Sequence, residues 1–198
     1  MVESGWAMTQ RFGNFIARRA GSGEYLKIGF SPNSIPLQQR WRNNGLSADF
    51  LADYLSTFFP GKDPDSAERQ AEIKDAVSYL ANELLENAMK FSYALPQHTV
   101  SIEMFLEADV ISLYVTNNLD PSTLEGFQAY IQRLLTEDPD ALYMERLERN
   151  ATENSEEASG LGFLTMLNNY GATLAWEFTD FGESGDGVTV TTMAQLTV

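Results

Sequence analysis

The stretch NELLENAMKFS, residues 82–92, lies at the end of the most regular apolar pattern in the chain. Apolar residues recur there at steps of three and four: Ile73, Val77, Leu80, Leu84, Ala88 and Phe91. Side chains at these steps share one face of a helix. The sequence therefore predicts a single long helix, over about residues 66–93, that buries this face against the rest of the protein.

Three polar residues follow a line beside the apolar face of this helix. Glu83, Asn87 and Lys90 stand at positions i, i+4 and i+7, so their side chains share one edge. An asparagine oxygen can bind magnesium, a lysine can attract phosphate, and a glutamate can orient or deprotonate an attacking group. The same spacing is also found in ordinary polar residues beside a buried face, and both interpretations stay open here.

Composition and charge narrow the class of protein. The 198 residues are 43% hydrophobic, which is typical of one folded domain. No apolar run is long enough for a membrane span and no secretory signal precedes the first strand, so we expect a soluble, cytoplasmic protein with no membrane contact. The chain has no cysteine and one histidine, which excludes a disulfide framework and makes a zinc enzyme an unlikely class.

The net charge sets a condition on any nucleotide site. The chain has 13 basic and 28 acidic residues, a formal charge of -15. Such a charge repels nucleic acid, and we expect no nucleic-acid partner. It also opposes ATP, so an ATP site would need its own cations and magnesium.

The order of predicted elements favours an α+β fold of two layers. Strands are predicted at 24–32, 99–107, 109–117, 172–180 and 187–198, with the second and third forming a hairpin in the middle of the sheet. Between the first two strands, residues 35–64 are expected to form two short helices separated by Asn43, Asn44 and Gly45. Residues 1–24 are interpreted as a separate basic and aromatic segment with a short helix, and residues 25–198 as one domain.

Residues 119–159, the acidic insert, interrupt this pattern. Two amphipathic helices are predicted, at 122–135 and 140–150. The acidic insert has ten acidic and three basic residues, about half of the net negative charge of the chain. We interpret it as a mobile or partner-facing segment.

The segment 82–92 resembles the N box of the Bergerat-fold (GHKL) ATPase superfamily, which includes gyrase, sensor histidine kinases and anti-sigma-factor serine kinases. The family pattern is an acidic residue, a leucine-like residue, Asn-Ala and a basic residue, and each position has its match here. The resemblance implies a mixed, mostly antiparallel sheet covered by helices on one face. It also implies that Glu83 is the general base, that Asn87 holds magnesium and that Lys90 is a cation on the phosphate side.

A second stretch, SGLGFLTML (159–167), resembles the second glycine box of the same superfamily. In that box Gly-x-Gly opens a helix whose backbone N–H groups bind phosphate. By resemblance Gly160, Leu161 and Gly162 would bind the cofactor ATP. The alternative, a simple turn before a helix, also remains open.

The first glycine box differs from the family pattern. The family has Asp-x-Gly-x-Gly after a strand, whereas this chain has TNNLDPS, with Asn117 at the aspartate position. An asparagine oxygen can still accept from the adenine amino group, so Asn117 is the predicted adenine contact. Leu119 and Pro121 stand at the two glycine positions and remove the freedom of a glycine hinge.

Two functions follow from this resemblance. The layout resembles the stand-alone anti-sigma serine kinases, which implies an ATP- and magnesium-dependent serine/threonine kinase that phosphorylates a small antagonist protein. The alternative is a non-catalytic interaction module with the same fold, which binds a regulatory protein through the acidic insert and residues 1–24. A homodimer is open under either function.

Overall fold

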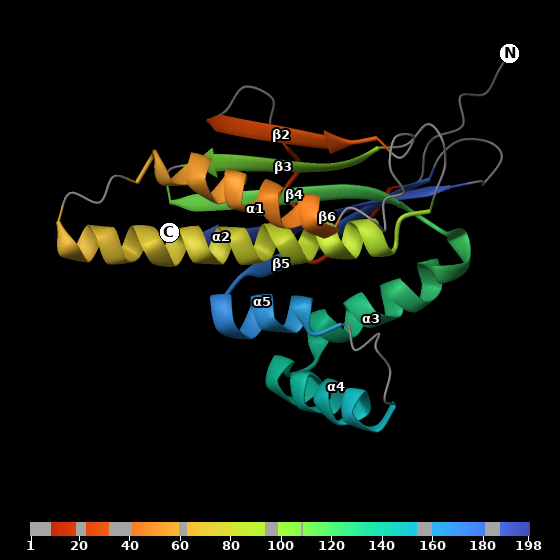
Figure 1. The fold of residues 1–198 in the computed structure, drawn as a ribbon. Coiled ribbons are helices and arrows are strands. Elements are labelled where there is room, and N and C mark those ends of the chain that lie inside the picture. The colour runs from red at the N-terminus through yellow and green to blue at the C-terminus, as the bar shows by residue number, and fades with distance from the viewer. Residues whose placement is uncertain are drawn as a thin grey trace, which may run out of the picture.

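The computed structural model describes residues 9–18, 23–31, 41–59, 63–93, 99–107, 109–153, 160–180 and 187–198. Within these residues the chain forms six strands and five α-helices (Figure 1). The elements in chain order are β1 (Thr9–Phe12), β2 (Glu24–Phe30), α1 (Trp41–Ser56), α2 (Pro64–Lys90), β3 (Val100–Glu107), β4 (Val110–Leu119), the short 3₁₀ helix η2 (Pro121–Thr123), α3 (Leu124–Thr136), α4 (Pro139–Glu153), α5 (Gly162–Tyr170), β5 (Thr173–Asp180) and β6 (Val188–Thr197).

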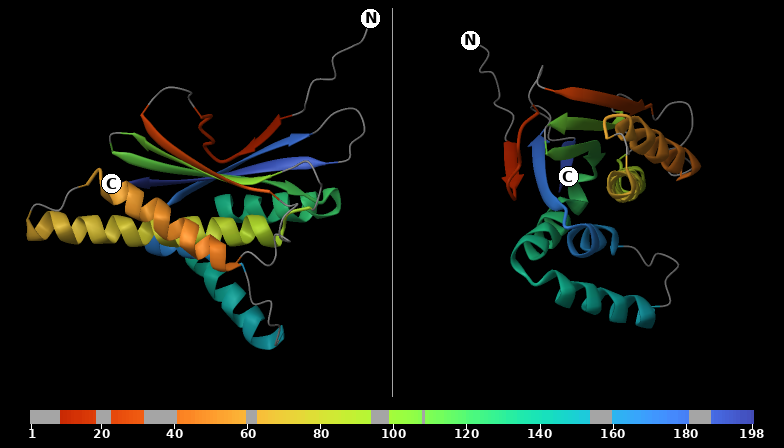
Figure 2. Two further views of the ribbon diagram at one scale, coloured as in Figure 1. Left: turned by 45° about the horizontal axis from the view of Figure 1, so that its top comes forward. Right: turned by 90° about the vertical axis from the view of Figure 1, so that its left-hand side faces the viewer.

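The strands form one sheet in the order β1-β5-β6-β4-β3-β2, with helices covering one face (Figure 2). This confirms the predicted α+β sandwich of two layers, with the β3–β4 hairpin inside the sheet. The expectation of a mixed sheet is wrong for the described strands, since every pair is antiparallel. The β2–β3, β3–β4 and β5–β6 connections each begin the next strand at the end where the previous one stopped, which makes those pairs antiparallel. The helical connection from β4 to β5 joins two strands of the same direction, but β6 lies between them and is antiparallel to both.

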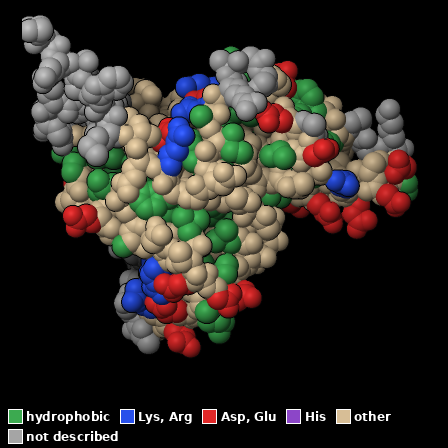
Figure 3. Space-filling view, turned by 180° about the vertical axis from the view of Figure 1, so that it is seen from behind, with side chains coloured by type: hydrophobic (Ala, Val, Ile, Leu, Met, Phe, Trp, Pro, Cys, Tyr) green, Lys and Arg blue, Asp and Glu red, His purple; other side chains and the backbone are tan. Residues whose placement is uncertain are grey.

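The two faces of the sheet differ in chemistry because side chains alternate along each strand. In β4, Ile111, Leu113 and Val115 face the helices and join the main hydrophobic core. Tyr114 faces the other side, in a small cluster with Ala175 and Met193. Figure 3 views this uncovered side and shows few charged side chains over its middle. The main core therefore lies between the sheet and the helices.

The short helix expected in residues 1–24 is wrong for the part that the structure describes. Residues 9–12 form β1, an edge strand paired with β5. Phe12 packs edge-on against Phe178, with ring centroids 5.6 Å apart, and Arg11 lies 2.7 Å from Glu177. Two neighbouring residues of β1 thus contact two neighbouring residues of β5, which is the pairing of a strand and not of a helix. Residues 1–8 and 19–22 lie outside the described residues.

Helix α1 corrects a second expectation. It runs unbroken through Asn43, Asn44 and Gly45, where two helices were expected. The reason is burial: Ala48, Leu51, Ala52 and Leu55 belong to the hydrophobic core, and Asn44 is only 1% exposed. Packing against the core outweighs the weak local preferences of Asn and Gly, which cost about 1 kcal/mol each at most.

Helix α2 confirms the long helix predicted from the apolar pattern. It begins at a capping box in which the Asp63 carboxylate accepts from the Ser66 N–H at 2.9 Å. Val77, Leu80, Leu84 and Ala88 are buried, as predicted. Phe91 is not: the helix ends at Lys90, so the Phe91 side chain leaves the buried face and is 52% exposed.

The described part of the acidic insert forms η2, α3 and α4, close to the two predicted helices. The buried residues Ile131, Leu134 and Leu142 join the insert to the main core. No helix in the described part of the chain is both long enough and apolar enough to cross a membrane.

Candidate functional site

A cavity of about 550 Å³ lies where α2, β4, β6, the acidic insert and the start of α5 meet. Its volume is within the usual range for small-molecule sites. Most of its lining is apolar, with a few polar and cationic side chains. The lining residues are Leu84, Asn87, Ala88, Phe91, Val115, Asn117, Leu119, Thr123, Gly126, Phe127, Ala129, Tyr130, Arg133, Arg146, Arg149, Gly160, Gly162, Phe163, Val190 and Thr192.

Four of the predicted site residues line this one cavity, although they come from three distant segments. Asn87 is in the last turns of α2, Asn117 is near the end of β4, and Gly160 and Gly162 precede or open α5. The fold thus brings residues of the two segments that resemble the N box and the second glycine box to one cavity with Asn117.

Asn117 is buried against the sheet and faces the cavity. Its side-chain amide donates a hydrogen bond to the backbone oxygen of Asn118 at 3.1 Å. Because the amide nitrogen makes this bond, the side-chain oxygen is the atom that would accept a hydrogen bond from a ligand. Asn117 can therefore present an acceptor to an amino group on a flat apolar ligand.

Gly160 lies in close contact with a guanidinium group. Its φ is +104°, and a Cβ added there would lie 2.6–2.9 Å from the guanidinium atoms of Arg146. The Tyr130 hydroxyl donates to the Gly160 oxygen at 3.0 Å. Only glycine permits both this backbone conformation and this approach. Gly160, two residues before α5, is thereby held in the wall of the cavity.

Leu161 is the N-cap of α5, and its side chain makes no capping hydrogen bond. The first backbone N–H groups of a helix lack partners within the helix, and the helix dipole makes this end attractive to anions. Leu161 itself is not among the lining residues. The phosphate contact predicted for Leu161 would therefore be made by backbone N–H groups beside Gly162.

Glu83 lies next to the cavity and not in its lining. A Cβ added at Gly162 would overlap the Glu83 carboxylate, so the carboxylate lies close to the start of α5. Burial raises the pKa of Glu83, and the nearby charge of Glu86 raises it further. A carboxyl group with a raised pKa is better suited to accept a proton near neutral pH.

Lys90 is in the last turn of α2, exposed, with its ammonium 5.5 Å from the centre of the Phe91 ring. It does not line the cavity, whereas Phe91 does. The structure thus places Lys90 away from the lining, and its assignment to phosphate stays a prediction.

Three arginines are the cationic side chains in the lining of the cavity, where the sequence analysis expected Lys90. Arg133, Arg146 and Arg149 are the three basic residues of the acidic insert, and all of them line the cavity. They also line a smaller cavity of about 60 Å³ together with Tyr130 and Glu145. The sequence carried a signal that we did not use: isolated cations in an acidic segment, two of them spaced by three on one helix face.

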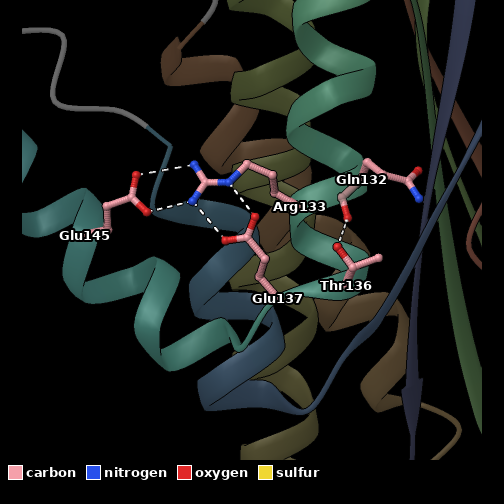
Figure 4. Close-up of polar contacts among 5 residues, drawn as sticks. All are labelled: Gln132, Arg133, Thr136, Glu137 and Glu145. Atoms are coloured by element: carbon pink, nitrogen blue, oxygen red, sulfur yellow. Dashed lines mark hydrogen bonds and ion pairs between the residues drawn. The ribbon is translucent and has the colours of Figure 1, made fainter.

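Arg133 also joins α3 to α4 (Figure 4). Its guanidinium donates to Glu137 at 2.7 and 2.9 Å and to Glu145 at 3.3 and 2.6 Å. These hydrogen bonds raise the pKa of Arg133, and they lower the pKa of both carboxyl groups. Arg133 is therefore a fixed cation that holds the two helices together at the rim of the cavity.

The residues at the first glycine box form a rigid turn. Leu119 is buried and lines the cavity, and Pro121 begins η2. The Asp120 carboxylate caps this turn by accepting from the Ser122 N–H at 2.9 Å. Where the resemblance predicts a glycine hinge, the chain has a capped 3₁₀ turn, and Leu119 adds an apolar side chain to the lining of the cavity.

Magnesium would have few protein ligands at this site. No group of three or more His, Cys, Asp or Glu residues that could hold a metal occurs in the described ranges. Asn87 offers one side-chain oxygen at the cavity wall. Such a set fits a magnesium ion that arrives with the phosphates of a nucleotide, since Mg²⁺ keeps several waters and uses few protein ligands.

Comparison with known proteins gave only weak likeness, and only to solved structures. No protein-family model matches the chain, and no curated protein sequence matches it. Among solved structures it is similar to the mycobacterial sensor histidine kinase MprB, at 18% sequence identity and a TM-score of 0.33, over 63% of this chain and 76% of that chain. A likeness at this level supports no statement about the site.

Proposed function

We propose that the cavity binds ATP with magnesium. In this proposal the adenine ring lies among the apolar side chains with its amino group toward Asn117, and the phosphates lie toward Asn87 and the turn at 160–162. The observation that supports it is the shared lining: Asn87, Asn117, Gly160 and Gly162 line one cavity of suitable size.

The objection raised by the net charge is answered at the site itself by Arg146 and Arg149. Arg133 is not counted, because its guanidinium is committed to Glu137 and Glu145. A chain of charge -15 repels a polyanion unless cations stand at the site itself. Arg146 and Arg149 line the cavity and are drawn from a segment that is mostly acidic. Guanidinium groups bind phosphate through paired hydrogen bonds, so they suit this role better than a lysine on a flexible stem.

We further propose that the protein is a regulatory serine/threonine kinase of the anti-sigma, partner-switching type. Glu83 would then accept the proton of the substrate hydroxyl as its oxygen attacks the γ-phosphate, and ADP would leave. The raised pKa of Glu83 and its place one turn before Asn87 support this role. Its contact with Gly162 means that the carboxylate must turn toward the cavity to act.

The second candidate function is a non-catalytic interaction module. Two observations favour it: Glu83 lies outside the cavity lining, and Leu119 and Pro121 make a rigid turn at the position of the glycine hinge. In this case the cavity would hold a nucleotide without transfer, or hold none.

Calorimetric titration with ATP, with and without magnesium, tests the binding proposal. We expect binding that requires magnesium and that falls at least about tenfold in Asn87→Ala, since each lost metal ligand costs on the order of 1.4 kcal/mol or more. Asn169→Ala, at an exposed position on α5, is the matched control. No heat of binding at millimolar ATP would refute the proposed site.

Glu83→Gln separates the two functions once ATP binding is established. For a kinase, nucleotide affinity should stay and transfer from labelled ATP to a serine-containing protein substrate should fall by about 10² or more. Undiminished transfer would remove Glu83 from the mechanism. Binding without any transfer by the wild-type protein would favour the interaction module.

A further inference from the structure

The outward face of α1 carries large apolar side chains that nothing in the described structure covers. Leu46, Phe50 and Phe58 are 65%, 54% and 42% exposed. Together with Tyr54 they stand four residues apart, so they form one row along the helix and the turn after it. We call Leu46, Phe50, Tyr54 and Phe58 the α1 ridge. A row of exposed apolar residues on one helix is characteristic of a docking surface.

The α1 ridge is separate from the candidate nucleotide site. None of its four residues lines the 550 Å³ cavity. Helix α1 packs on α2 beside β2 and β3, whereas α3, α4 and α5 lie on the opposite side of α2 (Figures 1 and 2). A partner on the ridge would therefore leave the cavity open.

Carboxylates border the α1 ridge on both sides. On the α2 side, Asp53 lies 2.5 Å from the Lys74 ammonium, and Asp49 accepts from the Ser78 hydroxyl at 2.9 Å. On the β2 side, the Tyr54 hydroxyl donates to Glu24 at 2.5 Å.

Among the side chains that the structure describes beside the ridge, the carboxylates outnumber the cations. The charges of Asp49, Asp53 and Asp75 all act on Lys74 and raise its pKa, so one ammonium faces three carboxylates. Arg42, at the N-terminal end of α1, is the one basic residue in the sequence of this helix. An occupant of the ridge must therefore bring its own positive charge.

We propose that the α1 ridge binds a basic amphipathic helix of a partner protein. The apolar stripe of that helix would pack against Leu46 and Phe50, and its flanking lysines or arginines would meet Asp49, Asp53 and Glu24. Rows of side chains four residues apart interlock with the equivalent rows of another helix, which favours a helical partner over an extended one. Complementary charge would set the orientation and the rate of association.

The same charges argue against other occupants of the α1 ridge. A second copy of the chain would bring Asp49 and Asp53 opposite carboxylates of the first copy, and like charges across an interface cost several kcal/mol in typical cases. An anionic membrane surface would be repelled for the same reason. Binding of a helix to the α1 ridge does not depend on ATP binding in the cavity. An experiment can therefore refute either proposal without refuting the other.

Fluorescence anisotropy with a designed peptide tests the proposal. The probe is a labelled helix of about 20 residues, with leucines on one face and lysines beside them, a length at which an isolated helix is stable enough to bind as one. We expect saturable binding that falls at least about tenfold in the double variant Leu46→Ala, Phe50→Ala. Asp49→Asn with Asp53→Asn should weaken binding and reduce its dependence on salt.

A matched control guards against unspecific attraction to an acidic protein. Met144 and Leu147 on α4 are exposed apolar residues, and Glu145 and Glu148 lie beside them. Met144→Ala with Leu147→Ala should leave peptide binding unchanged, and ATP binding should be the same in the ridge variants as in the wild type. Equal weakening by the control pair, or no saturable binding, would overturn the proposal. So would a wild-type dimer in sedimentation that becomes monomeric in the ridge variant, because the occupant would then be a second copy.

Discussion

At the scale of single residues, the glycines before α5 matter because of what lies against them. Gly160 admits the Arg146 guanidinium, and Gly162 admits the Glu83 carboxylate. Both contacts join a residue of the second glycine box to a charged side chain from another helix. The two glycines therefore fix charged groups next to the cavity, in addition to opening α5.

Gly162→Ala should destabilise the fold, because the new methyl group overlaps the Glu83 carboxylate. A loss of about 1–3 kcal/mol in the free energy of unfolding is typical of such overpacking. Urea unfolding would measure it. In the double variant Glu83→Ala, Gly162→Ala the overlap is gone, so most of the loss should be recovered; losses that simply add would show that the two residues do not interact.

The raised pKa of Glu83 gives stability a defined dependence on pH. Because burial places the folded-state pKa above the ordinary value of 4.5, the carboxyl group favours folding below that value, and this contribution is lost as pH rises through the folded-state pKa. Glu83→Gln should therefore be more stable than wild type at neutral pH, and the gain should shrink toward about pH 4.

Thermal unfolding at several pH values measures the gain in stability of Glu83→Gln over the wild type. Glu68→Gln is the control. Glu68 is an exposed carboxylate on the same helix, so the control removes one negative charge without relieving a buried one. A gain that is equal in the two variants, or one that grows at low pH, would contradict the assignment of burial as the cause.

Residue types and spacing predicted part of the lining of the cavity. Asn87, Gly160 and Gly162 belong to segments that resemble motifs with fixed neighbours, and all three line it. Asn117 lines it too, although the glycines expected after it are replaced by Leu119 and Pro121. The arginines could not be assigned in that way, since a cation in an amphipathic helix points to solvent unless the fold turns it inward. Lys90 was chosen by its distance along the helix, but the end of α2 leaves it exposed.

At the scale of elements, predictions of secondary structure from local sequence were least reliable where burial determines whether a helix or strand forms. The buried side chains of α1 carry that helix through Asn43, Asn44 and Gly45. Strand β1 forms because Phe12 and Arg11 find partners on β5, which no local pattern records. Long periodic segments such as α2 were predictable because the period itself reports the buried face.

Gly45→Ala tests the unbroken helix directly. An added methyl group meets only the Asn82 side chain, at 4.0 Å, so the change should stabilise α1 by about 0.5–1 kcal/mol through helix propensity. Gly171→Ala is the opposed control: Gly171 has φ +60° at the end of α5 and open space around it, so alanine there should destabilise. A melting temperature of Gly45→Ala below that of the wild type would mean that α1 is broken at the glycine.

At the scale of the whole molecule, the distribution of charge is more informative than its total. The chain is strongly acidic, yet the three basic residues of the acidic insert line one cavity, and carboxylates border the exposed ridge of α1 on the other side of α2. Under the two proposals the protein has two surfaces of opposite charge preference. The cavity would bind an anion, and the α1 ridge would bind a cationic partner.

The most direct test of the central claim compares ATP with adenosine in calorimetric titrations of Arg149→Gln and of the double variant Arg146→Gln, Arg149→Gln. If the arginines bind phosphate, ATP affinity should fall at least about tenfold in the double variant. Adenosine affinity should stay unchanged, because adenosine has no phosphate for the arginines to contact. Arg69→Gln, on the exposed side of α2, is the control for net charge. Equal loss for both ligands, or no loss for ATP, would contradict the account of a nucleotide site with its cations in the acidic insert.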